Sequence, residues 1–355
     1  MKTIDVEIRI YDADMQFLGL IENETSFQWN RKYNEPGSFE LHCPITESNG
    51  LLLKRSHLVW KKGAAEAGVI ESLELKETVS GNEIIAKGRF LSAYMDRRLI
   101  QPFYKINDGL VEEAMREILI KAAPIPRVEL GEKRNYTERV TFQATYRNLL
   151  KYEEKLARFI NTGFRFRPDF VNKKIFFELY RGIDHSVHQD AKNRVIFSDE
   201  YGNLTEADYV ENDQLFKNVC YVGGQGEEEN RTIVVAGDDT LSGLERREEF
   251  ISATDITQEG ITDQQYKEAL KQRGVDQLKK DILASSMECS VNPYGNFSYE
   301  EDYDLGDIVT IRKAKFGIEQ DMRLTEVYEI YERGIYKIRL TFGSPLPTAV
   351  DWSDQ

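Results

Sequence analysis

The sequence lacks several features on which function predictions often rest. It has no run of about 18 apolar residues, so no segment is expected to span a membrane. The opening residues, MKTIDVEIRI, show neither the apolar segment nor the cleavage site of a secretory signal, and export is not expected. Three cysteines, Cys43, Cys220 and Cys289, lie far apart without a Cys-x-x-Cys pair. This spacing argues against a zinc ribbon or a disulfide framework and fits synthesis in a reducing cytosol.

The charge balance disfavours a second class of function. The chain has 61 acidic and 47 basic residues, which gives a formal net charge of −14 at pH 7. Affinity for a phosphate backbone comes from clustered Lys and Arg, so a protein that grips nucleic acid is not expected. A surface past which nucleic acid slides is compatible with this charge. The composition, with 41% hydrophobic and 30% charged residues, indicates a soluble globular protein. A length of 355 residues suggests roughly two or three domains.

The N-terminal part of the chain is expected to be β throughout. Apolar residues alternate with charged ones from Ile4 to Ile10, the pattern of a strand with one buried face. Further short strands follow, including one at 26–31 with Phe27 and Trp29 on the same face. Gly, Asn and Pro separate them in turns. Short and regularly spaced strands of this kind indicate a small barrel or sandwich.

The character of the sequence changes after Pro102. Asp108 is expected to cap a helix that stops at Pro124, and a second helix is expected at about 147–161. A hairpin at 164–180 completes an α+β unit. Strands return from Val195, interrupted by a helix that opens at Thr262.

The predicted fold class is α+β, mainly β, with two related antiparallel β-barrel domains. The predicted boundaries are a first barrel at 1–98, an inserted α+β domain at 99–192, a second barrel at 193–250 and 300–347, and a helix-containing insertion at 251–299.

A weak internal repeat supports the two related barrels. Val69–Glu77 aligns without gaps on Leu324–Glu332, and each segment is followed by a strand that ends in Phe, at Phe90 or Phe342. The aligned glutamates are Glu71 with Glu326, Glu74 with Glu329 and Glu77 with Glu332. Three copies of a chain with two similar barrels would form a pseudo-sixfold ring, which can adapt a hexameric assembly to a trimeric one.

Two segments deserve comparison with known metal and phosphate sites. The segment Asp184–Asp190 contains His185 and His188 between carboxylates, as nitrogen and oxygen metal ligands would require, but it lacks a third defined ligand. A solvated linker is the preferred interpretation. Gly223-Gly224-Gln225-Gly226 follows a strand, as a phosphate loop would, but Glu227-Glu228-Glu229 comes next and would repel phosphate. A hairpin turn is therefore expected there.

The remaining candidates for chemistry are acidic and aromatic clusters. A glycosidase needs two facing carboxyls, and Asp238-Asp239 with Glu300-Glu301-Asp302 are conceivable members of such a pair. Because chance neighbours are expected among 61 acidic residues, a solvated surface is the preferred interpretation. No Gly-x-Ser-x-Gly element or Cys/His pair for nucleophilic catalysis is found. The aromatic residues Phe176, Phe177 and Tyr180 could line a groove for sugar or peptide, although core packing is the preferred interpretation, and His42 and His57 are expected to be half-exposed strand residues. No catalytic, cofactor-binding or metal residue is assigned, and no cofactor is expected.

Several longer motifs resemble a known family. They are WNRKYNEPGSFEL from Trp29, VWKKG from Val59, GRFLSAYMDRRLI from Gly88, YDLGDIVTI from Tyr303 and TEVYEIYERGIYKIRLTFG from Thr325. Together and in this order, the motifs resemble siphophage and prophage tail proteins of Gram-positive bacteria. These are baseplate hub proteins, or the N-terminal portion of tail-associated lysins, and they are similar to contractile-phage hubs and to the base of type VI spikes.

The resemblance implies a structural virion protein rather than an enzyme. It implies a homotrimer at the tail tip whose two barrels per subunit continue the tail tube, with DNA passing through the lumen without specific binding. The implied partners are the distal tail protein, the tape measure protein and receptor-binding or fibre proteins, with possible contact to the cell wall. Assembly would occur in the bacterial host cytoplasm. On this resemblance, Gly306 in Leu305-Gly306-Asp307 supplies backbone freedom to a turn that starts a barrel strand.

Two alternatives remain open at this point. The first is a cell-wall hydrolase that uses the acidic clusters, although the lytic domain that many relatives carry downstream would have to be absent or supplied by another protein. The second is a carbohydrate-binding module that recognises host wall polymers through its aromatic residues.

Overall fold

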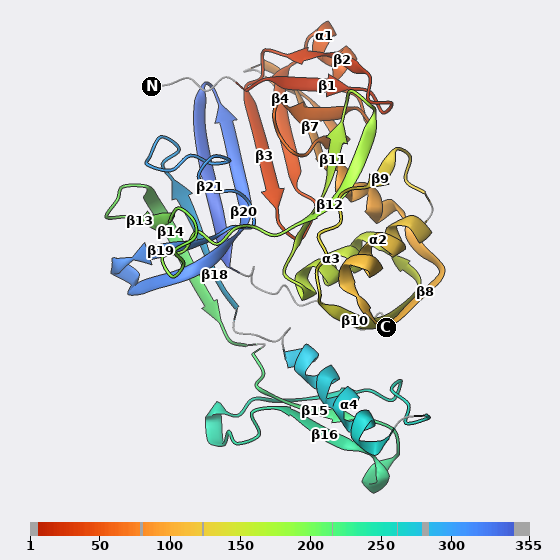
Figure 1. Ribbon diagram of the computed structural model, residues 1–355. Coiled ribbons are helices and arrows are strands. Elements are labelled where there is room, and N and C mark those ends of the chain that lie inside the picture. The colour runs from red at the N-terminus through yellow and green to blue at the C-terminus, as the bar shows by residue number, and fades with distance from the viewer. Residues whose placement is uncertain are drawn as a thin grey trace. The chain divides into compact units, whose positions relative to one another are not determined.

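The computed structural model describes residues 6–78, 81–122, 124–214, 216–260, 262–278 and 284–343 (Figure 1). The chain divides into two compact units. Unit 1 comprises the residues up to Asp208 together with Met287–Gly343, and unit 2 comprises Tyr209–Ser286. With 47% of the chain in strands and 18% in helices, and with mostly antiparallel sheets, the predicted α+β, mainly β class is confirmed. No helix in the described part of the chain is long and apolar enough to cross a bilayer.

The first half of unit 1 contains a five-stranded antiparallel sheet in the order β3-β4-β7-β6-β5. Its strands are β3 (Ser26–Lys32), β4 (Ser38–Pro44), β5 (Leu58–Lys61), β6 (Gly68–Thr78) and β7 (Gly81–Phe90). We call this sheet repeat A. Helix α1 (Glu47–Leu52), capped by the Thr46 side chain, lies between β4 and β5 in sequence. Strands β1 (Ile8–Tyr11) and β2 (Phe17–Ile21) extend the sheet beyond β5.

A second sheet repeats this arrangement, and the ends of two of its strands, 209–212 and 284–286, belong to unit 2. Its strands are β14 (Leu204–Asn212), β18 (Ala284–Val291), β19 (Ile308–Lys313), β20 (Ile318–Glu332) and β21 (Ile335–Gly343). Their order in the sheet is β14-β18-β21-β20-β19, with the short strand β13 (Ile196–Ser198) added parallel to β19. We call this sheet repeat B. Numbered by sequence within each repeat, both sheets follow the order first, second, fifth, fourth, third.

The two repeats also agree in detail, but not in the alignment expected from the sequence. The β6–β7 hairpin closes at Thr78 and Gly81, and the β20–β21 hairpin closes at Glu332 and Ile335. The same shift of 254 positions places the bulge of one hairpin, at Glu71, on the bulge of the other, at Thr325. The expected alignment used a shift larger by one residue and is wrong. Because side chains alternate along a strand, that error would exchange the two faces of the sheet.

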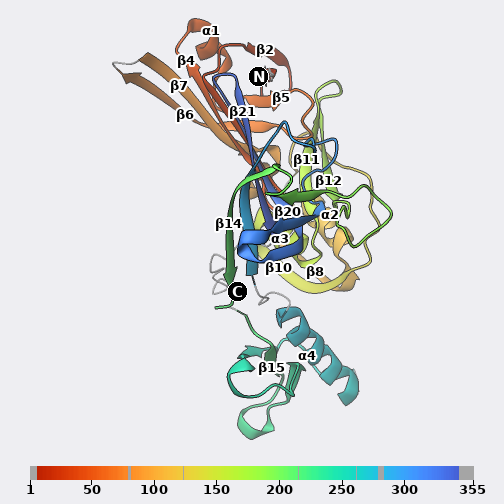
Figure 2. The same ribbon diagram turned by 90° about the vertical axis from the view of Figure 1, so that its left-hand side faces the viewer.

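The two repeats join edge to edge into one 13-stranded sheet through antiparallel pairing of β3 with β20 (Figure 1). Figure 2 shows β6 and β7 extending side by side to their turn. Within the described residues, the outermost strands β14 and β2 do not pair with each other, so no closed barrel forms in one chain. The expected pair of barrels is thereby corrected to two related sheets. A single chain leaves free strand edges, which a barrel would not have.

The segment between the repeats forms the α+β part of unit 1. It contains the 3-10 helix η1 (Leu91–Arg97), the ribbon of β8 (Leu99–Leu110) with β10 (Arg139–Asn148), helices α2 (Val111–Lys121) and α3 (Leu149–Phe159), and the sheet of β9 (Val128–Leu130), β11 (Gly163–Asp169) and β12 (Lys174–Tyr180). Both expected helices are present. The predicted cap is wrong, because Asp108 does not cap α2. Asp108 lies in β8 and forms an ion pair with Arg139 at 2.9 Å.

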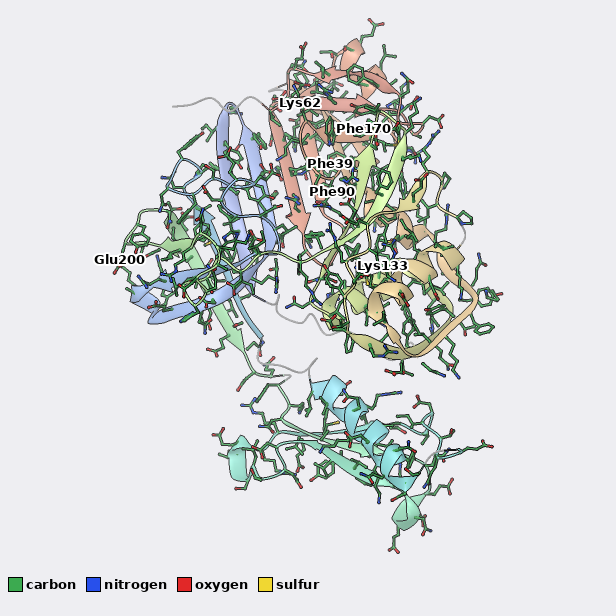
Figure 3. All side chains as sticks on the ribbon, viewed as in Figure 1. Phe39, Lys62, Phe90, Lys133, Phe170 and Glu200 are labelled. Carbon is green, nitrogen blue, oxygen red and sulfur yellow. The ribbon has the colours of Figure 1, made fainter. Side chains whose placement is uncertain are left out.

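Apolar side chains attach this α+β part to repeat A. Phe170, in the turn between β11 and β12, stacks on Tyr11 with ring centroids 3.8 Å apart and lies 5.2 Å from Trp60 (Figure 3). Phe39 and Phe90 are buried on the inner side of repeat A, where Phe90 lies 4.4 Å from Trp29. The predicted placement of Phe27 and Trp29 on one face is confirmed by their complete burial.

Unit 2 is formed by residues inserted between the first and second strands of repeat B. Strands β15 (Val219–Gly223), β16 (Ile233–Gly237) and β17 (Glu248–Ser252) form their own sheet, and α4 (Asp263–Leu278) packs on it. Gly274 of α4 has a packing role, because an added Cβ would lie 2.6 Å from the Ala236 side chain. The short helices η2 (Glu228–Asn230), η3 (Gly243–Glu245) and, in repeat B, η4 (Ala314–Phe316) complete the structure.

The four domain boundaries expected from the sequence stay a prediction. One observation bears on them: β15, β16 and β17 pair with one another, although the prediction assigned residues up to 250 to the second barrel. Periodicity identifies a strand but does not identify the sheet that it joins, which explains why this assignment was not evident from the sequence.

A buried carboxyl in α3 makes the stability of this region depend on pH. Glu153 is fully buried, and neither of its carboxyl oxygens has a hydrogen-bond partner. Burial raises the pKa of Glu153 well above its ordinary value. Because the pKa is higher in the folded state than in the unfolded state, the associated stability is present below the unfolded pKa of 4.5 and is lost as pH rises towards the folded pKa.

We therefore expect Glu153→Gln to melt at a higher temperature than the parent, with a gap that widens from about pH 5 to about pH 8. Thermal unfolding followed by circular dichroism at both pH values measures this gap. Glu132→Gln, at an 82% exposed side chain, is the control and should leave the gap constant. An equal difference in melting temperature between Glu153→Gln and the parent at both pH values would show that ionisation of Glu153 does not reduce the stability of the folded state.

Candidate functional site

The most distinctive site of the chain is the junction between the two repeats. Seven residue pairs connect β3 and β20, from Ser26 opposite Glu332 to Lys32 opposite Glu326. On the inner face, Phe27, Trp29 and Arg31 lie opposite Tyr331, Glu329 and Val327. A charged residue on each strand therefore faces the core. Buried charges need partners, and the junction supplies them.

Arg31 is the centre of one buried ion cluster. It is 2% exposed, and its Nε atom lies 2.9 Å from the Glu66 carboxylate, which is also 2% exposed. Its Nη1 atom lies 2.8 Å from Asp304 and also donates to the Tyr299 hydroxyl. Glu66 belongs to repeat A, whereas Tyr299 and Asp304 precede β19 in repeat B. One guanidinium thus connects both repeats in a low-dielectric setting, where charge-assisted hydrogen bonds are strong.

A second ion pair lies beside the first. Lys61 of β5 contacts Glu329 of β20 at 2.5 Å, with both side chains almost fully buried. The other oxygen of Glu329 accepts hydrogen bonds from the Tyr331 and Tyr336 hydroxyls at 2.7 and 3.1 Å. Burial raises the pKa of both tyrosines, and the Glu329 charge raises it further. The hydroxyls therefore stay protonated and act as donors.

The turn that contains Gly306 occurs in both repeats. Gly306 has φ +97°, and its N–H donates to the Leu324 carbonyl at 2.8 Å. In repeat A the corresponding residue is Ser56, with φ +71° and a 2.8 Å bond to the Ile70 carbonyl. The predicted use of backbone freedom at Gly306 is confirmed. The turn holds the strand before each hairpin, β5 or β19, against that hairpin in the same register.

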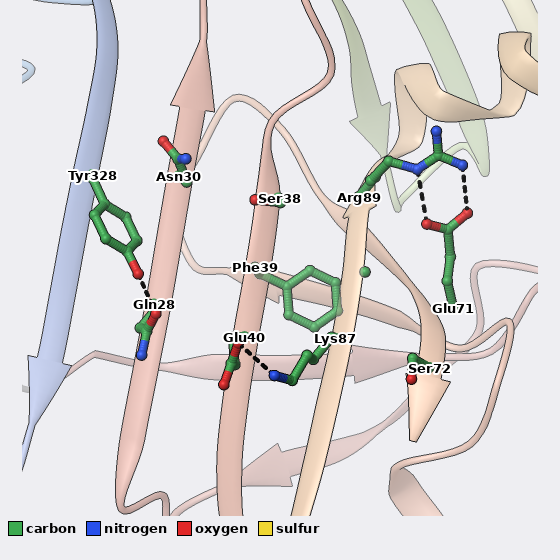
Figure 4. A pocket seen from close by; sticks show the side chains of 11 residues that line it. Gln28, Asn30, Ser38, Phe39, Glu40, Glu71, Ser72, Lys87, Arg89 and Tyr328 are labelled. Carbon is green, nitrogen blue, oxygen red and sulfur yellow. Dashed lines mark hydrogen bonds and ion pairs between the residues drawn. The ribbon is translucent and has the colours of Figure 1, made fainter. Parts of the chain in front are cut away.

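The opposite face of the joined sheet is polar and holds a shallow groove of about 390 Å³ across β20, β3, β4, β7 and β6 (Figure 4). On this face Lys87 pairs with Glu40 at 2.9 Å, Arg89 pairs with Glu71 at 2.9 Å, and the Tyr328 hydroxyl bonds to Gln28. These are contacts between neighbouring strands. They neutralise charge within the sheet.

Charges of both signs are balanced on this polar face. Across the six neighbouring strands β6, β7, β4, β3, β20 and β21, the register places six acidic and six basic side chains on this face. The acidic residues are Glu40, Glu71, Glu74, Glu83, Glu326 and Glu332, and the basic residues are Lys32, Lys76, Lys87, Arg89, Lys337 and Arg339. The excess of acid in the whole chain therefore lies elsewhere. His42 belongs to the same face and lies 2.7 Å from Glu40 and 3.1 Å from Glu83.

The candidate metal segment is held by intramolecular contacts. His188 Nδ1 lies 2.5 Å from Asp321, and His185 Nδ1 lies 2.7 Å from the Asn193 carbonyl. The segment lies along β19, where the His185 N–H donates to the Ile308 carbonyl at 2.8 Å. Across the described ranges, no three His, Cys, Asp or Glu side chains are grouped as metal ligands.

The other candidates also have structural contacts. Gly224 follows β15, next to the Tyr266 hydroxyl, which accepts a 2.6 Å hydrogen bond from the Gln225 N–H. Asp239 pairs with Arg246 at 2.7 Å in unit 2, and Glu300 lies 3.6 Å from Arg31 in unit 1. Among the aromatic candidates, Phe177 is fully buried, and the ring of Phe176 lies below Arg167. Tyr180 contacts Tyr33 edge to face. The His57 ring bonds to the Leu52 carbonyl.

Comparison with known proteins identifies the class to which this architecture belongs. Residues 7–344 match the family model described as Siphovirus ReqiPepy6 Gp37-like protein. The chain belongs to this family of phage tail proteins. No curated protein matches the sequence. The expected resemblance to siphophage and prophage tail proteins is confirmed.

Solved structures show the same fold at low sequence identity. This tail protein is similar to a tail protein from Neisseria meningitidis with a TM-score of 0.65 and 13% identity, covering 96% of this chain and 97% of that one. For the 43 kDa tail protein of prophage MuSo2 from Shewanella oneidensis, the values are 0.62 and 12%, with 95% and 98% covered. For a prophage tail protein from Listeria monocytogenes they are 0.58 and 14%, with 98% of each chain covered. At these identities the likeness concerns the fold alone.

The junction residues of this tail protein were missed by sequence reasoning. Arg31 follows Phe27 and Trp29 at a spacing of two, on a face that the pattern assigns to the core. A charged residue at a core position is a signal for a buried ion pair. The partners of Arg31 are distant in sequence, at Glu66 and Asp304, and no local pattern identifies them.

Removing Arg31 should strongly destabilise the tail protein, because Glu66 would remain buried without a counter-charge. We expect Arg31→Met to lower the free energy of unfolding by about 3–5 kcal/mol. Urea denaturation monitored by tryptophan fluorescence measures this loss.

The control for Arg31→Met is a half-exposed pair of the same chemistry. Arg9 pairs with Glu7, with side chains 32% and 35% exposed. Arg9→Met should lower the free energy of unfolding by only about 0–1 kcal/mol. Equal losses in the two variants would contradict a central role for the Arg31 cluster.

Proposed function

We propose that this tail protein is a structural hub of the phage tail tip, in which three copies form a pseudo-sixfold ring that continues the tail tube. The observation that carries the proposal is the internal repeat: two sheets of identical strand order lie side by side and are joined through β3 and β20. A ring of three such chains presents six related sheets, so it can meet sixfold and threefold neighbours. In this proposal the two tube domains are repeat A, which lies within the predicted domain at 1–98, and repeat B, which consists of β14 and β18–β21 without the separate sheet β15–β17.

The polar face of the joined sheet supports a role as the wall of a DNA channel. Its six cations are matched by six carboxylates, and several lie in direct ion pairs such as Lys87 with Glu40. Phosphate binding requires cations that are free to replace counterions. A wall whose cations are already compensated allows DNA to pass without retaining it. In this proposal DNA passes without binding because the cations of the polar face are compensated, and not because the whole chain is acidic.

The remaining parts of the proposal follow from a location in the virion. The distal tail protein, the tape measure protein and receptor-binding or fibre proteins are the proposed partners, and assembly is proposed to occur in the host cytoplasm. A non-enzymatic role agrees with the family. No specific observation favours a hydrolase or a wall-binding module, because the acidic and aromatic candidates make structural contacts.

The proposed ring predicts a mass in solution. We expect the purified chain at micromolar concentration to have about three times its 41.1 kDa mass, measured by light scattering after size exclusion. Denaturant should return the particle to monomers. A stable monomer at the same concentration would contradict the ring.

The compensated wall predicts the effect of removing its carboxylates. We expect a Glu40→Gln, Glu83→Gln and Glu326→Gln variant to retain double-stranded DNA in a gel-shift assay at low salt, with retention that falls steeply as salt rises. The parent should not retain DNA. The control, Glu22→Gln, Glu47→Gln and Glu132→Gln, makes the same change of charge at exposed positions away from this face. Equal DNA retention by both variants would contradict a specific role for the face.

A further inference from the structure

We infer that the sheet of unit 2 has a docking face for another tail protein, and that the docked segment is apolar with basic residues on either side. The face is the side of β15, β16 and β17 that points away from α4, and we call it the open face of unit 2. This inference goes beyond the proposed hub, because it depends neither on the number of copies nor on a ring.

Helix α4 covers one side of this three-stranded sheet, as Figure 1 shows. On that side Cys220, Val222 and Ala236 are completely buried. An added Cβ at Gly274 of α4 would contact all three of these side chains, so helix and sheet are closely packed there. Because side chains alternate along a strand, the intervening residues belong to the open face.

The open face has a row of apolar side chains across its three strands. The register places Val235 of β16, Tyr221 of β15 and Phe250 of β17 next to one another. Ile233 follows on the same side of β16, two residues from Val235. Phe250 is 54% exposed and Ile233 is 46% exposed, whereas sheets normally bury an apolar face against another layer.

The strand sequences also indicate burial on both sides of the sheet. Strand β15 reads VCYVG and β16 reads IVVAG, so neither strand has a charged residue on either face. Continuous apolar runs are typical of strands whose two faces are covered, whereas a solvated face carries alternating polar residues. The polar face of the joined sheet shows the solvated pattern, with pairs such as Lys87 and Glu40. The open face of unit 2 thus has the sequence of a covered surface.

Arg231 is held flat on the open face. Its guanidinium lies over Gly223, where an added Cβ would be 2.6 Å from the Arg231 Nε atom. It donates to the Gly223 and Gly224 carbonyls and to the Ser252 hydroxyl, and it lies 5.2 Å from the centre of the Phe250 ring. Within the described residues these bonds use Nε and Nη2. The Nη1 donors are therefore available to carbonyl groups of a partner.

Arg246 fixes Tyr221 on the same face. Its Nη2 atom donates to the Tyr221 hydroxyl at 2.9 Å, and its guanidinium pairs with Asp239 at 2.7 Å and with Glu248. Side chains that are already held in place lose little freedom on binding. Tyrosine and arginine are also enriched among the residues that carry most of the binding energy of protein interfaces. The composition of the open face therefore favours a protein partner.

The charge around the open face determines the chemistry of that partner. Glu227, Glu228 and Glu229 are exposed at the end of the sheet where β15 leads into β16, and no ion pair within the described residues neutralises them. At the opposite end, the exposed Glu245 precedes β17. A partner with Lys or Arg beside its apolar segment would complement these carboxylates. The same carboxylates would repel the phosphates of nucleic acid.

Photo-cross-linking in assembled tails tests the docking face. The photoreactive residue p-benzoylphenylalanine replaces Phe250 in the full chain, which is produced together with the tail genes of its own phage. We expect ultraviolet light to link this position to one other tail protein, in a segment that mass spectrometry identifies as apolar with adjacent Lys or Arg. The control places the same residue at Lys271, which is exposed on α4 and should give no such product. Ile233, on the open face, is the second position if the Phe250 variant does not assemble.

Charge neutralisation tests the basic character of the segment. Adding Glu227→Gln, Glu228→Gln and Glu229→Gln to the cross-linking chain should lower the yield of the product by about threefold or more. The matched control, Glu211→Gln, Glu259→Gln and Glu268→Gln, makes the same change of charge at other exposed positions of unit 2 and should leave the yield unchanged. Equal yields from the two chains would overturn the charge complementarity.

The remaining outcomes contradict the docking face itself. A product that contains only this chain, a product that nuclease removes, or no product above the Lys271 control at either open-face position would overturn the inference. A linked segment without adjacent Lys or Arg would do the same. These results are independent of the mass in solution, so the docking face and the proposed hub can fail separately.

Discussion

The pairing of β3 with β20 is the constraint on which the rest of the structure depends. It joins strands almost 300 residues apart in sequence and requires Arg31 and Glu329, two charges of opposite sign, to face the core. Each charge is matched across the junction, by Asp304 and by Lys61. Buried charges of this kind contribute less net stability than apolar packing would, but they penalise any other register, because a slip would leave them unpaired.

The two repeats show how one strand order serves different purposes. Repeat A connects its first two strands with a short turn, whereas repeat B inserts unit 2 at the same place. The ladder of strands is preserved in both, since insertions at a turn leave the sheet's hydrogen bonds intact. The features relevant to a tail protein are accordingly extended ones: free strand edges, and a polar face on which carboxylates compensate cations. Neither feature has a short sequence motif, and the residues that match chemical motifs make structural contacts instead.

The comparison of sequence with structure separates local from long-range information. Alternating residues correctly indicated the strands, and the apolar stripes indicated α2 and α3, because both patterns report which side of an element is buried. The internal repeat was also recognised, but one residue out of register. A pattern of period two matches almost as well after a small slip, and only the hairpin ends and bulges, at Glu71 and Thr325, define the correct alignment.

By itself, the sequence determined the fold class, the repeat and the family resemblance, since these depend on periodicity and on the order of motifs along the chain. The tertiary structure alone decided that β15–β17 form a sheet of their own, that the two related sheets join instead of closing separately, and that Arg31 and Glu329 are buried partners of Glu66, Asp304 and Lys61. The physical reason is that strand pairing and ion pairing are chosen among residues brought together by folding, and residues distant in sequence carry no local mark of each other.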